Sequence, residues 1–295
     1  MPSTLALRDS PGLRLRQAWE RECIALPGVF DPLVAKMAEN LGFSAVYLSG
    51  AALSAGKNLP DVGLVTLTEF VESAREIVRV CSLPLLCDAD TGFGEALAVE
   101  RTVQLFEEVG AAGIHLEDQE MPKRCGHLSG KTLVNAATMI AKIRAAVAAK
   151  RDKNFVIVAR TDARGVGNFD QAVTRAKVYL ENGADAVFPE ALETEEEFER
   201  FAKEVDAPLL ANMTEFGKSP LISREKLAQM GYRMVLYPVS VYRAALFAAR
   251  KALEQIKAGP TQEVLLPEML TRAELYELLN YTGYEERDKR YFGGK

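Results

Sequence analysis

The sequence predicts an α/β protein, a (β/α)8 TIM barrel with additional C-terminal helices. Short apolar or β-branched runs alternate with segments of helical periodicity along the whole chain, which is typical of a parallel sheet. Eight such runs are present, the number of strands that closes this barrel. The 295 residues, 48% of them hydrophobic, are enough for one barrel of roughly 250 residues and exclude a disordered or fibrous protein.

The expected elements follow one another without a linker or a second apolar core, so 1–295 is predicted to be a single barrel domain. The strands are expected at Cys23–Leu26, Ala45–Leu48, Leu83–Cys87, Gly113–Leu116, Phe155–Ala159, Ala186–Phe188, Pro208–Ala211 and Met234–Tyr237. The helices between them are expected at Asp31–Leu41, Leu67–Val80, Ala96–Val109, Ala136–Lys150, Phe169–Asn182, Glu195–Glu204 and Ser223–Met230. Glycine precedes four of the strands, as at helix C-caps.

The two ends of the chain depart from this alternation. Residues 1–20 are expected as an N-terminal extension, and 241–295 as C-terminal helices. Val241–Ala258 and Thr271–Tyr281 are predicted helices, separated by a Gly-Pro break. This is more helix than one closing element needs, so we expect the extra helix to pack on a neighbouring subunit. The charged and aromatic Glu285–Lys295 is expected on the surface or against a partner.

Composition limits the function classes. The charge sum of 36 basic against 41 acidic residues gives −5, with no Lys/Arg-rich block, so neither nucleic acid nor a membrane is an expected partner. Met1–Arg16 lacks the apolar core of a signal peptide, and no run of 18 uncharged apolar residues follows. The four cysteines form no C-x-x-C pair, so reduced thiols and a cytoplasmic location are expected.

Polar residues follow six of the predicted strands at the end where barrel enzymes carry their active sites. For any one of them the alternative is that the chain simply reaches the surface there. Six polar groups at the same end of their strands favour a functional site. They are Ser49-Gly50-Ala51, Asp88-Ala89-Asp90, Glu117-Asp118, Arg160-Thr161-Asp162, Glu190 and Asn212-Met213-Thr214.

Two carboxylates of this set indicate a metal. Asp88 and Asp90 are two residues apart, so on an extended strand they would face the same side. Oxygen ligands with few imidazoles favour Mg²⁺, or Mn²⁺, over zinc, and Glu117 from the next strand could hold a metal-bound water. The alternative is that these acids form structural salt bridges with Arg160 or Lys123.

The loop after the fourth strand combines a thiol with potential cations, in the run Pro122–His127. Neighbouring cations are expected to lower the pKa of Cys125 and make it a proton donor or nucleophile; the alternative is an inert loop cysteine. His127 and His115 are the only histidines, which excludes a three-histidine zinc site. No predicted strand contains lysine, so a Schiff-base aldolase is not expected, with Lys123 as the only fallback.

The expected substrate is a small di- or tricarboxylate. Arg160 suits bidentate binding of a carboxylate, and Asn212 and Thr214 add neutral donors. Mg²⁺, a proton-donating thiol and carboxylate clamps together suggest making or breaking a carbon–carbon bond next to a carboxylate.

With these motifs, the chain resembles the isocitrate lyase and phosphoenolpyruvate mutase superfamily over roughly Pro27 to Tyr284. Its 2-methylisocitrate-cleaving branch is the most similar, and the Lys-Arg-Cys-Gly-His run marks the lyases because the phosphonate-forming mutases lack that cysteine. The runs that carry the resemblance are Asp88–Gly94, Glu117–Gln119, Lys123–His127, Tyr47–Gly50, Leu59–Asp61, Phe188–Glu190, Asn212–Gly217 and Leu236–Pro238.

The resemblance implies a role for each matching residue. Asp88 and Asp90 would organise Mg²⁺, and Cys125 would be the catalytic acid/base. The implied substrate ligands are Ser49, Gly50 and Ala51 for the pyruvate half, Gly126, Asn212, Met213 and Thr214 for the succinate half, and also Arg160, Glu190, Arg243 and Arg272. Supporting residues without an assigned role are Tyr47, Asp61, Glu117, Lys123 and His127. Ala51 departs from relatives that carry glycine there.

The resemblance also implies a homotetramer whose terminal helices swap between subunits. The implied reaction is Mg²⁺-dependent cleavage of 2-methylisocitrate to pyruvate and succinate in the methylcitrate cycle. The alternatives are a related lyase or hydrolase acting on isocitrate, dimethylmalate or oxaloacetate, and a non-catalytic barrel that binds a dicarboxylate. Phe188 and Leu236 favour the methylated substrate over isocitrate, unless they only pack the core.

Overall fold

The computed structural model describes residues 10–128 and 130–293. These divide into two compact units, one ending at Tyr242 and one beginning at Arg243, and each is treated by itself. The first nine residues of the predicted extension lie outside the described residues. The strands of the first unit are β1 (Ile24–Pro27), β2 (Val46–Leu48), β3 (Leu85–Asp88), β4 (Gly113–Glu117), β5 (Val156–Thr161), β6 (Ala186–Pro189), β7 (Leu210–Asn212) and β8 (Met234–Tyr237).

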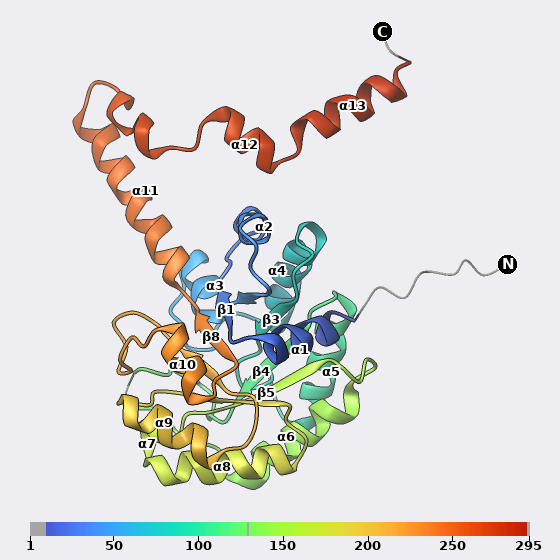
Figure 1. Ribbon diagram of the computed structural model, residues 1–295, viewed down its shortest axis with the longest axis vertical. Helices are drawn as coiled ribbons and strands as arrows, with labels where there is room; N and C mark the ends of the chain where they lie inside the picture. Colours follow the sequence, from blue (N-terminus) through green and yellow to red (C-terminus); the bar gives the residue numbers. More distant parts are fainter. Residues whose placement is uncertain (1–9, 129, 294–295) are drawn as a thin grey trace, which may run out of the picture. The chain divides into compact units, whose positions relative to one another are not determined.

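These strands form a closed parallel barrel (Figure 1). Strands β2 to β6 pair in chain order, and β1, β8 and β7 form a second group. Two single parallel bridges join the groups, from Gly28 to Tyr47 and from Val187 to Leu209. The predicted barrel is therefore confirmed, and every predicted strand lies within two residues of an observed one.

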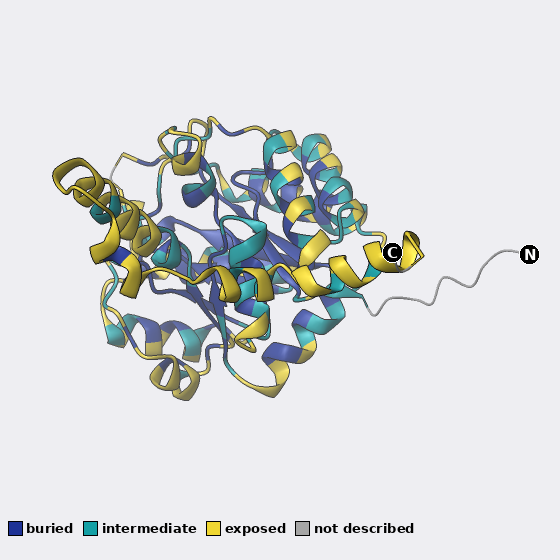
Figure 2. Cartoon of the chain, turned by 90° about the horizontal axis from the view of Figure 1, so that it is seen from above, coloured by how far each residue is buried: buried dark blue, intermediate teal, exposed yellow. Residues whose placement is uncertain are grey.

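Helices cover the outside of the barrel, and Figure 2 shows buried strands surrounded by helices with exposed outer faces. The helices between strands that the sequence predicts are observed as α2 (Pro32–Asn40), α4 (Leu67–Val80), α5 (Ala96–Glu108), α6 (Ala136–Ala149), α8 (Phe169–Glu181), α9 (Glu195–Glu204) and α10 (Arg224–Met230). Most begin at a side-chain cap; Thr66, for example, forms a capping box with Glu69 that satisfies the free backbone donors of α4.

Three helices of the first unit are not predicted from the sequence: α1 (Pro11–Arg21), α3 (Gly50–Gly56) and α7 (Ala163–Val166). The first has a clear physical origin. Ser10 caps it and Pro11 begins it, and its Leu15 and Trp19 are buried in the cluster of inward-facing strand residues. This burial anchors α1 to the barrel, whereas α3 and α7 are too short to show a helical period.

The second unit contains most of α11 (Ser240–Ala258), a 3₁₀ helix (Glu263–Glu268), α12 (Arg272–Leu278) and α13 (Tyr281–Tyr291). The predicted helix Thr271–Tyr281 ends early because Asn280 adopts a left-handed backbone conformation, with φ of 52°. The last of these helices lies within the predicted C-terminal helices, 241–295, and overlaps Glu285–Lys295, which the sequence places on the surface or against a partner. Across the described residues, 10–128 and 130–293, every helix is too short or too polar to cross a bilayer.

Candidate active site

The polar strand ends meet at one mouth of the barrel, as their register requires. Asp88 on β3 pairs with His115 on β4, and Glu117 at the end of β4 pairs with Arg160 on β5. Because parallel strands carry these residues side by side, functional groups from different parts of the chain face a common space.

Asp88 is the most tightly held of the acids. One of its carboxylate oxygens accepts the backbone N–H of Asp90 at 2.9 Å and the other that of Gly50 at 3.1 Å. A Cβ on Gly50 would lie 2.7 Å from this carboxylate, so the position needs glycine. Tyr47 Oη lies 3.5 Å from Asp88 and 2.7 Å from His115 Nε2. Burial alone would raise the pKa of Asp88, but facing positive charges lower it overall.

The geometry of Asp90 corrects the reasoning from strand period. β3 ends at Asp88, and Asp90 lies in the following turn with φ of 44°, so the two acids do not share the face of an extended strand. They still interact, because burial and the negative charge of Asp88 raise the pKa of Asp90 to about 7. Glu117 joins them through its backbone N–H, which donates to the Asp90 carbonyl at 2.9 Å.

Both ion pairs of the alternative interpretation are present: Lys123 lies 2.7 Å from Asp90, and Arg160 lies 3.3 Å from Glu117. These two ion pairs do not fully compensate the negative charge of the buried carboxylates. Burial still raises the pKa of Glu117 well above its ordinary value, and its Oε1 is buried without a hydrogen-bond partner. An orphaned buried carboxylate oxygen beside two further acids is suited to a hard cation.

Mg²⁺ fits this donor set. No group of three or more His, Cys, Asp or Glu side chains with ligand geometry occurs in the described part of the chain. This is compatible with Mg²⁺, which typically keeps several waters and binds through one or two carboxylates. Asp88 and Asp90 would hold it.

We call residues 119–128 and 130–133 the Cys125 loop. The loop crosses from the metal acids, which are Asp88, Asp90 and Glu117, to the clamp residues, which are Arg160 and Glu190. Gln119 fixes it, because its amide accepts the Arg124 N–H and donates to the Arg124 carbonyl, both at 2.8 Å. On one side of Cys125, Lys123 also donates to Asp61. On the other side, His127 Nε2 lies 2.9 Å from Glu190 Oε1.

Gly126 is the point of closest approach between this loop and the clamp residues. A Cβ there would lie 2.5 Å from both Arg160 Nη2 and Glu190 Cδ, so only glycine fits. With Lys123 on the metal acids and Gly126 against the clamps, Cys125 lies between the two halves of the site.

The expectation that neighbouring cations lower the pKa of Cys125 is wrong. Burial raises the pKa of this thiol. Two neighbouring side chains are directed elsewhere: Lys123 toward Asp61 and Asp90, and His127 toward Glu190. The thiol is therefore protonated at neutral pH, which suits a proton donor better than a nucleophile.

Arg160 is already engaged by the protein. Its Nε and Nη2 bind Asp162 at 2.9 and 3.1 Å, and its guanidinium lies 5.1 Å from the Phe188 ring centroid. The expected bidentate clamp on a substrate carboxylate therefore cannot use this edge, which leaves the Nη1 side that faces Glu117. Glu190 lies 3.5 Å from Arg160, and Arg160 and His127 outweigh burial to hold the pKa of Glu190 below its ordinary value.

Of the remaining predicted residues, some lie at the mouth of the barrel and others have side chains directed away from it or lie in the second unit. Ser49 caps α3 next to Gly50. Asn212 donates to Glu190 at 3.2 Å, whereas the Met213 sulfur accepts the Ile222 N–H in the outer core, so only the main chain of Met213 is available to a ligand. Ala51 is half-buried in α3, and Thr214 is buried after β7. Arg243 and Arg272 lie in the second unit, and their role stays a prediction.

Sequence reasoning misses Lys131 and assigns no role to three further residues of the site, Gln119, His115 and Asp162. It marks His115 only as a second histidine, although the alternation of β4 places it beside Asp88. It gives Asp162 a strand-end position without a role, and the spacing from Arg160 is the available signal. Nothing local marks Lys131, which is buried by tertiary contacts alone.

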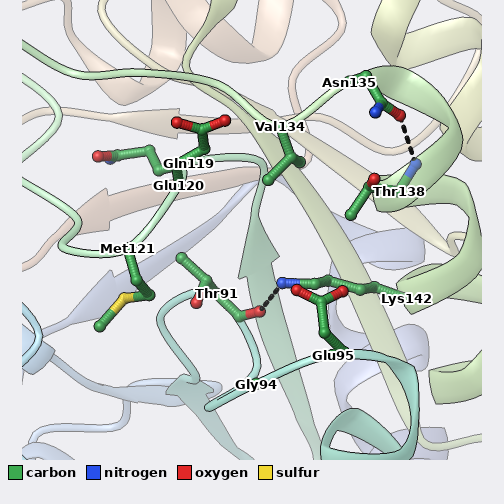
Figure 3. A pocket seen from close by; sticks show the side chains of 10 residues that line it. All are labelled: Thr91, Gly94, Glu95, Gln119, Glu120, Met121, Val134, Asn135, Thr138 and Lys142. Atoms are coloured by element: carbon green, nitrogen blue, oxygen red, sulfur yellow. Dashed lines mark hydrogen bonds between the residues drawn. The ribbon is translucent and has the colours of Figure 1, made fainter.

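A separate cavity of about 570 Å³ adjoins the turn that carries Asp90 (Figure 3). Lys142 extends into it from α6 and donates to the Thr91 carbonyl at 3.1 Å. Burial lowers the pKa of Lys142. Lys142 thus braces the main chain next to Asp90. The cavity is lined by Thr91, Gly94, Glu95, Gln119, Glu120, Met121, Val134, Asn135, Thr138 and Lys142.

Comparison with known proteins agrees with this geometry. The profile of the family described as phosphoenolpyruvate phosphomutase matches residues 15–257. A 2-methylisocitrate lyase of Aeropyrum pernix is 52% identical over 281 residues, 95% of this chain and 91% of that one. Further curated relatives at 41–51% identity are named 2-methylisocitrate lyase or probable 2-methylisocitrate lyase.

Solved structures of related enzymes have the same fold. An oxaloacetate acetylhydrolase in complex with 3,3-difluorooxalacetate is 34% identical with a TM-score of 0.89, covering 97% of this chain and 98% of that one. A phosphonopyruvate hydrolase in complex with oxalate and Mg²⁺ is 30% identical with a TM-score of 0.87, covering 96% and 99%. The chain belongs to the phosphoenolpyruvate phosphomutase family of enzymes, in the branch that contains the 2-methylisocitrate lyases.

Proposed function

We propose that this enzyme cleaves 2-methylisocitrate to pyruvate and succinate, with Mg²⁺ as its cofactor, as one step of the methylcitrate cycle. The observation that carries the proposal is that the Cys125 loop contacts both halves of the site, through Lys123 at Asp90 and through Gly126 at the clamp residues. The chain is also 52% identical to a 2-methylisocitrate lyase. The hydrolases and the dimethylmalate lyase among the similar structures are 30–34% identical.

The proposed mechanism assigns proton donation to Cys125. A base removes the hydroxyl proton of 2-methylisocitrate, and the carbon–carbon bond breaks to leave pyruvate and a carbanion on the succinate half. Burial keeps the Cys125 Sγ protonated, so Cys125 donates its proton to that carbon and is left as a thiolate. Asn212 holds a carboxylate of that half, the Nη1 side of Arg160 contacts the substrate next to Glu117, and the Gly50 region holds the pyruvate half beside Asp88. Bound Mg²⁺ supplies the positive charge that stabilises the developing oxyanion.

The cofactor proposal rests on the partly uncompensated acids of this site and on the related phosphonopyruvate hydrolase, whose structure is a complex with oxalate and Mg²⁺. Mn²⁺ prefers similar oxygen ligands and is expected to substitute.

One assay tests the function directly. Cleavage of 2-methylisocitrate, isocitrate, 2,3-dimethylmalate and oxaloacetate is followed side by side, with Mg²⁺ and with EDTA. The product measured is pyruvate for 2-methylisocitrate and 2,3-dimethylmalate, glyoxylate for isocitrate and oxalate for oxaloacetate. We expect EDTA-sensitive pyruvate from 2-methylisocitrate with the highest kcat/KM. Faster turnover of any other member of the panel would replace the proposed substrate, and binding without turnover of all four would indicate a non-catalytic barrel.

We also propose a homotetramer in the cytoplasm. Large apolar side chains are exposed on α11, among them Leu246, Phe247, Leu253 and Ile256. Separately, the first unit has an open groove of about 560 Å³ over β1 and β8, with Pro27 and Tyr237 in its wall. A helix from another copy would cover such a groove. Analytical ultracentrifugation tests the assembly, and Leu253→Glu should weaken it. The cytoplasm keeps thiols such as Cys125 reduced.

A further inference from the structure

We propose that Lys131 is a positioning residue that braces the main chain beside Cys125 against Asp162, the carboxylate that also holds Arg160. The proposal rests on the proposed function, and it adds the means by which the proton donor and the substrate-binding arginine keep a fixed relative position.

The contacts of Lys131 define the brace. Its side chain is completely buried, and its Nζ donates to the Gly126 carbonyl and lies 2.7 Å from Asp162 Oδ1. Gly126 directly follows Cys125. The ammonium therefore joins the loop next to the thiol to a residue that directly follows β5.

Asp162 extends the connection to the clamp. Its two oxygens bind Arg160 Nη2 at 3.1 Å and Nε at 2.9 Å, and Oδ1 is shared with Lys131. Its backbone N–H donates to Asp118 at 2.9 Å, so its main chain is fixed as well. A displacement of Lys131 would therefore shift both the Arg160 guanidinium and the Cys125 loop.

The charge balance explains why a second cation is needed here. Three buried carboxylates, Glu117, Asp162 and Glu190, face the single guanidinium of Arg160. Burying a charge without sufficient compensation is costly. The Lys131 ammonium compensates Asp162 and at the same time binds the Gly126 carbonyl of the Cys125 loop. Seating the loop is therefore favoured by the same charge that orients the arginine.

Gly165 provides the space for the ammonium. A Cβ at this position would lie 3.0 Å from Lys131 Nζ, which is tighter than an ordinary contact. This gives an independent way to disturb the brace, because Gly165→Ala crowds the ammonium and leaves its charge in place.

The experiment compares Lys131→Met with wild type and with Lys177→Met, a matched change at an exposed position on α8. The rate of alkylation of Cys125 by iodoacetamide is measured by peptide-resolved mass spectrometry, and reaction at Cys23 serves as the internal standard. We expect Lys131→Met to alkylate about 10- to 100-fold faster, the range for losing a hydrogen bond to a charged group. Removing a cation cannot itself make the thiol more acidic, so acceleration reports a displaced loop.

Steady-state kinetics with 2-methylisocitrate provide the second measurement. We expect kcat/KM of Lys131→Met to fall about 10- to 100-fold, with Lys177→Met unchanged. Ethylammonium added to Lys131→Ala should restore activity in a saturable way, which a purely structural lysine would not show. Gly165→Ala should shift both measurements in the same direction and covers the case in which the lysine variants fail to fold.

Alkylation rates within threefold of wild type in both Lys131→Met and Gly165→Ala would overturn the proposal. The alkylation result does not depend on the substrate. A wild-type protein that leaves 2-methylisocitrate intact would refute the proposed function, and the alkylation measurement would still decide whether Lys131 braces the loop.

Discussion

Gly126→Ala is the sharpest single test of the site geometry. The added methyl group would lie 2.5 Å from Arg160 Nη2 and from Glu190 Cδ. Both neighbours are buried and held from outside the loop, Arg160 by Asp162 and Glu190 by Asn212 and the Ala191 N–H. Neither can move away without breaking these contacts, so we expect the Cys125 loop to move instead.

The displacement can be estimated from the same distances. Reaching an ordinary contact of 3.4 Å from 2.5 Å requires the loop to retreat by at least about 0.9 Å, because Glu190 Cγ would be closer still. A misplacement of about 1 Å at a reacting group costs on the order of 10²-fold in rate. The substitution does not touch the barrel core, so we expect the melting temperature to change by no more than a few degrees.

The assay is kcat/KM for pyruvate release from 2-methylisocitrate, with thermal unfolding measured in parallel. Gly56→Ala is the matched control, because its Cβ would meet nothing closer than the Tyr242 hydroxyl at 3.9 Å. We expect Gly126→Ala to lose about 10²-fold in kcat/KM and Gly56→Ala to remain near wild type. A Gly126→Ala enzyme within threefold of wild type would refute the view that turnover requires the loop to sit against Arg160 and Glu190.

Four further outcomes follow from the contacts of the site and of the residues around it. Cys125→Ser should lower kcat by about 10² to 10⁴ if the thiol is the proton donor. Because burial raises the pKa of the Cys125 thiol, the alkaline decline of wild-type kcat should begin above about pH 8.5, the ordinary value for cysteine; a decline below pH 8 argues against this donor. Asp90, with a raised pKa of about 7, stabilises the metal-free fold below the ordinary pKa of an aspartate, and this contribution is lost as pH rises through 7. Mg²⁺ should therefore raise the melting temperature more at pH 8 than at pH 5.5, and an equal rise at both would contradict metal binding at this acid. Asp118→Asn should cost about 3–5 kcal/mol in urea unfolding, because Thr161, Arg175, Tyr179 and the Asp162 N–H all donate to this carboxylate; a loss under 1 kcal/mol would show that these donors find other partners.

The sequence is sufficient for the barrel because its strands are apolar runs of the right length, separated by helices with an amphipathic period. It is also sufficient for the position of the polar residues, since parallel strands deliver their ends to one mouth. It fails where tertiary contacts decide. The direction of the Lys123 side chain and the burial of Cys125 depend on residues distant in the chain, so the pKa of the thiol is predicted with the wrong sign. The helix α1 is missed because its apolar residues are buried by contacts with the barrel, which the local sequence does not show.

The charges at the mouth suggest why the loop carries more than the thiol. Among the described residues, three permanent cations form ion pairs at the mouth of the barrel: Arg160, Lys123 and Lys131. The acids in these ion pairs are Asp61, Asp90, Glu117, Asp162 and Glu190. Two of these three cations belong to the Cys125 loop. A polycarboxylate substrate would be repelled by the acids alone, so it needs both a divalent cation and the seated loop. The thiol thus approaches the substrate on the same segment that supplies the compensating charge, and we infer that binding of the substrate and placement of the proton donor are one coupled event.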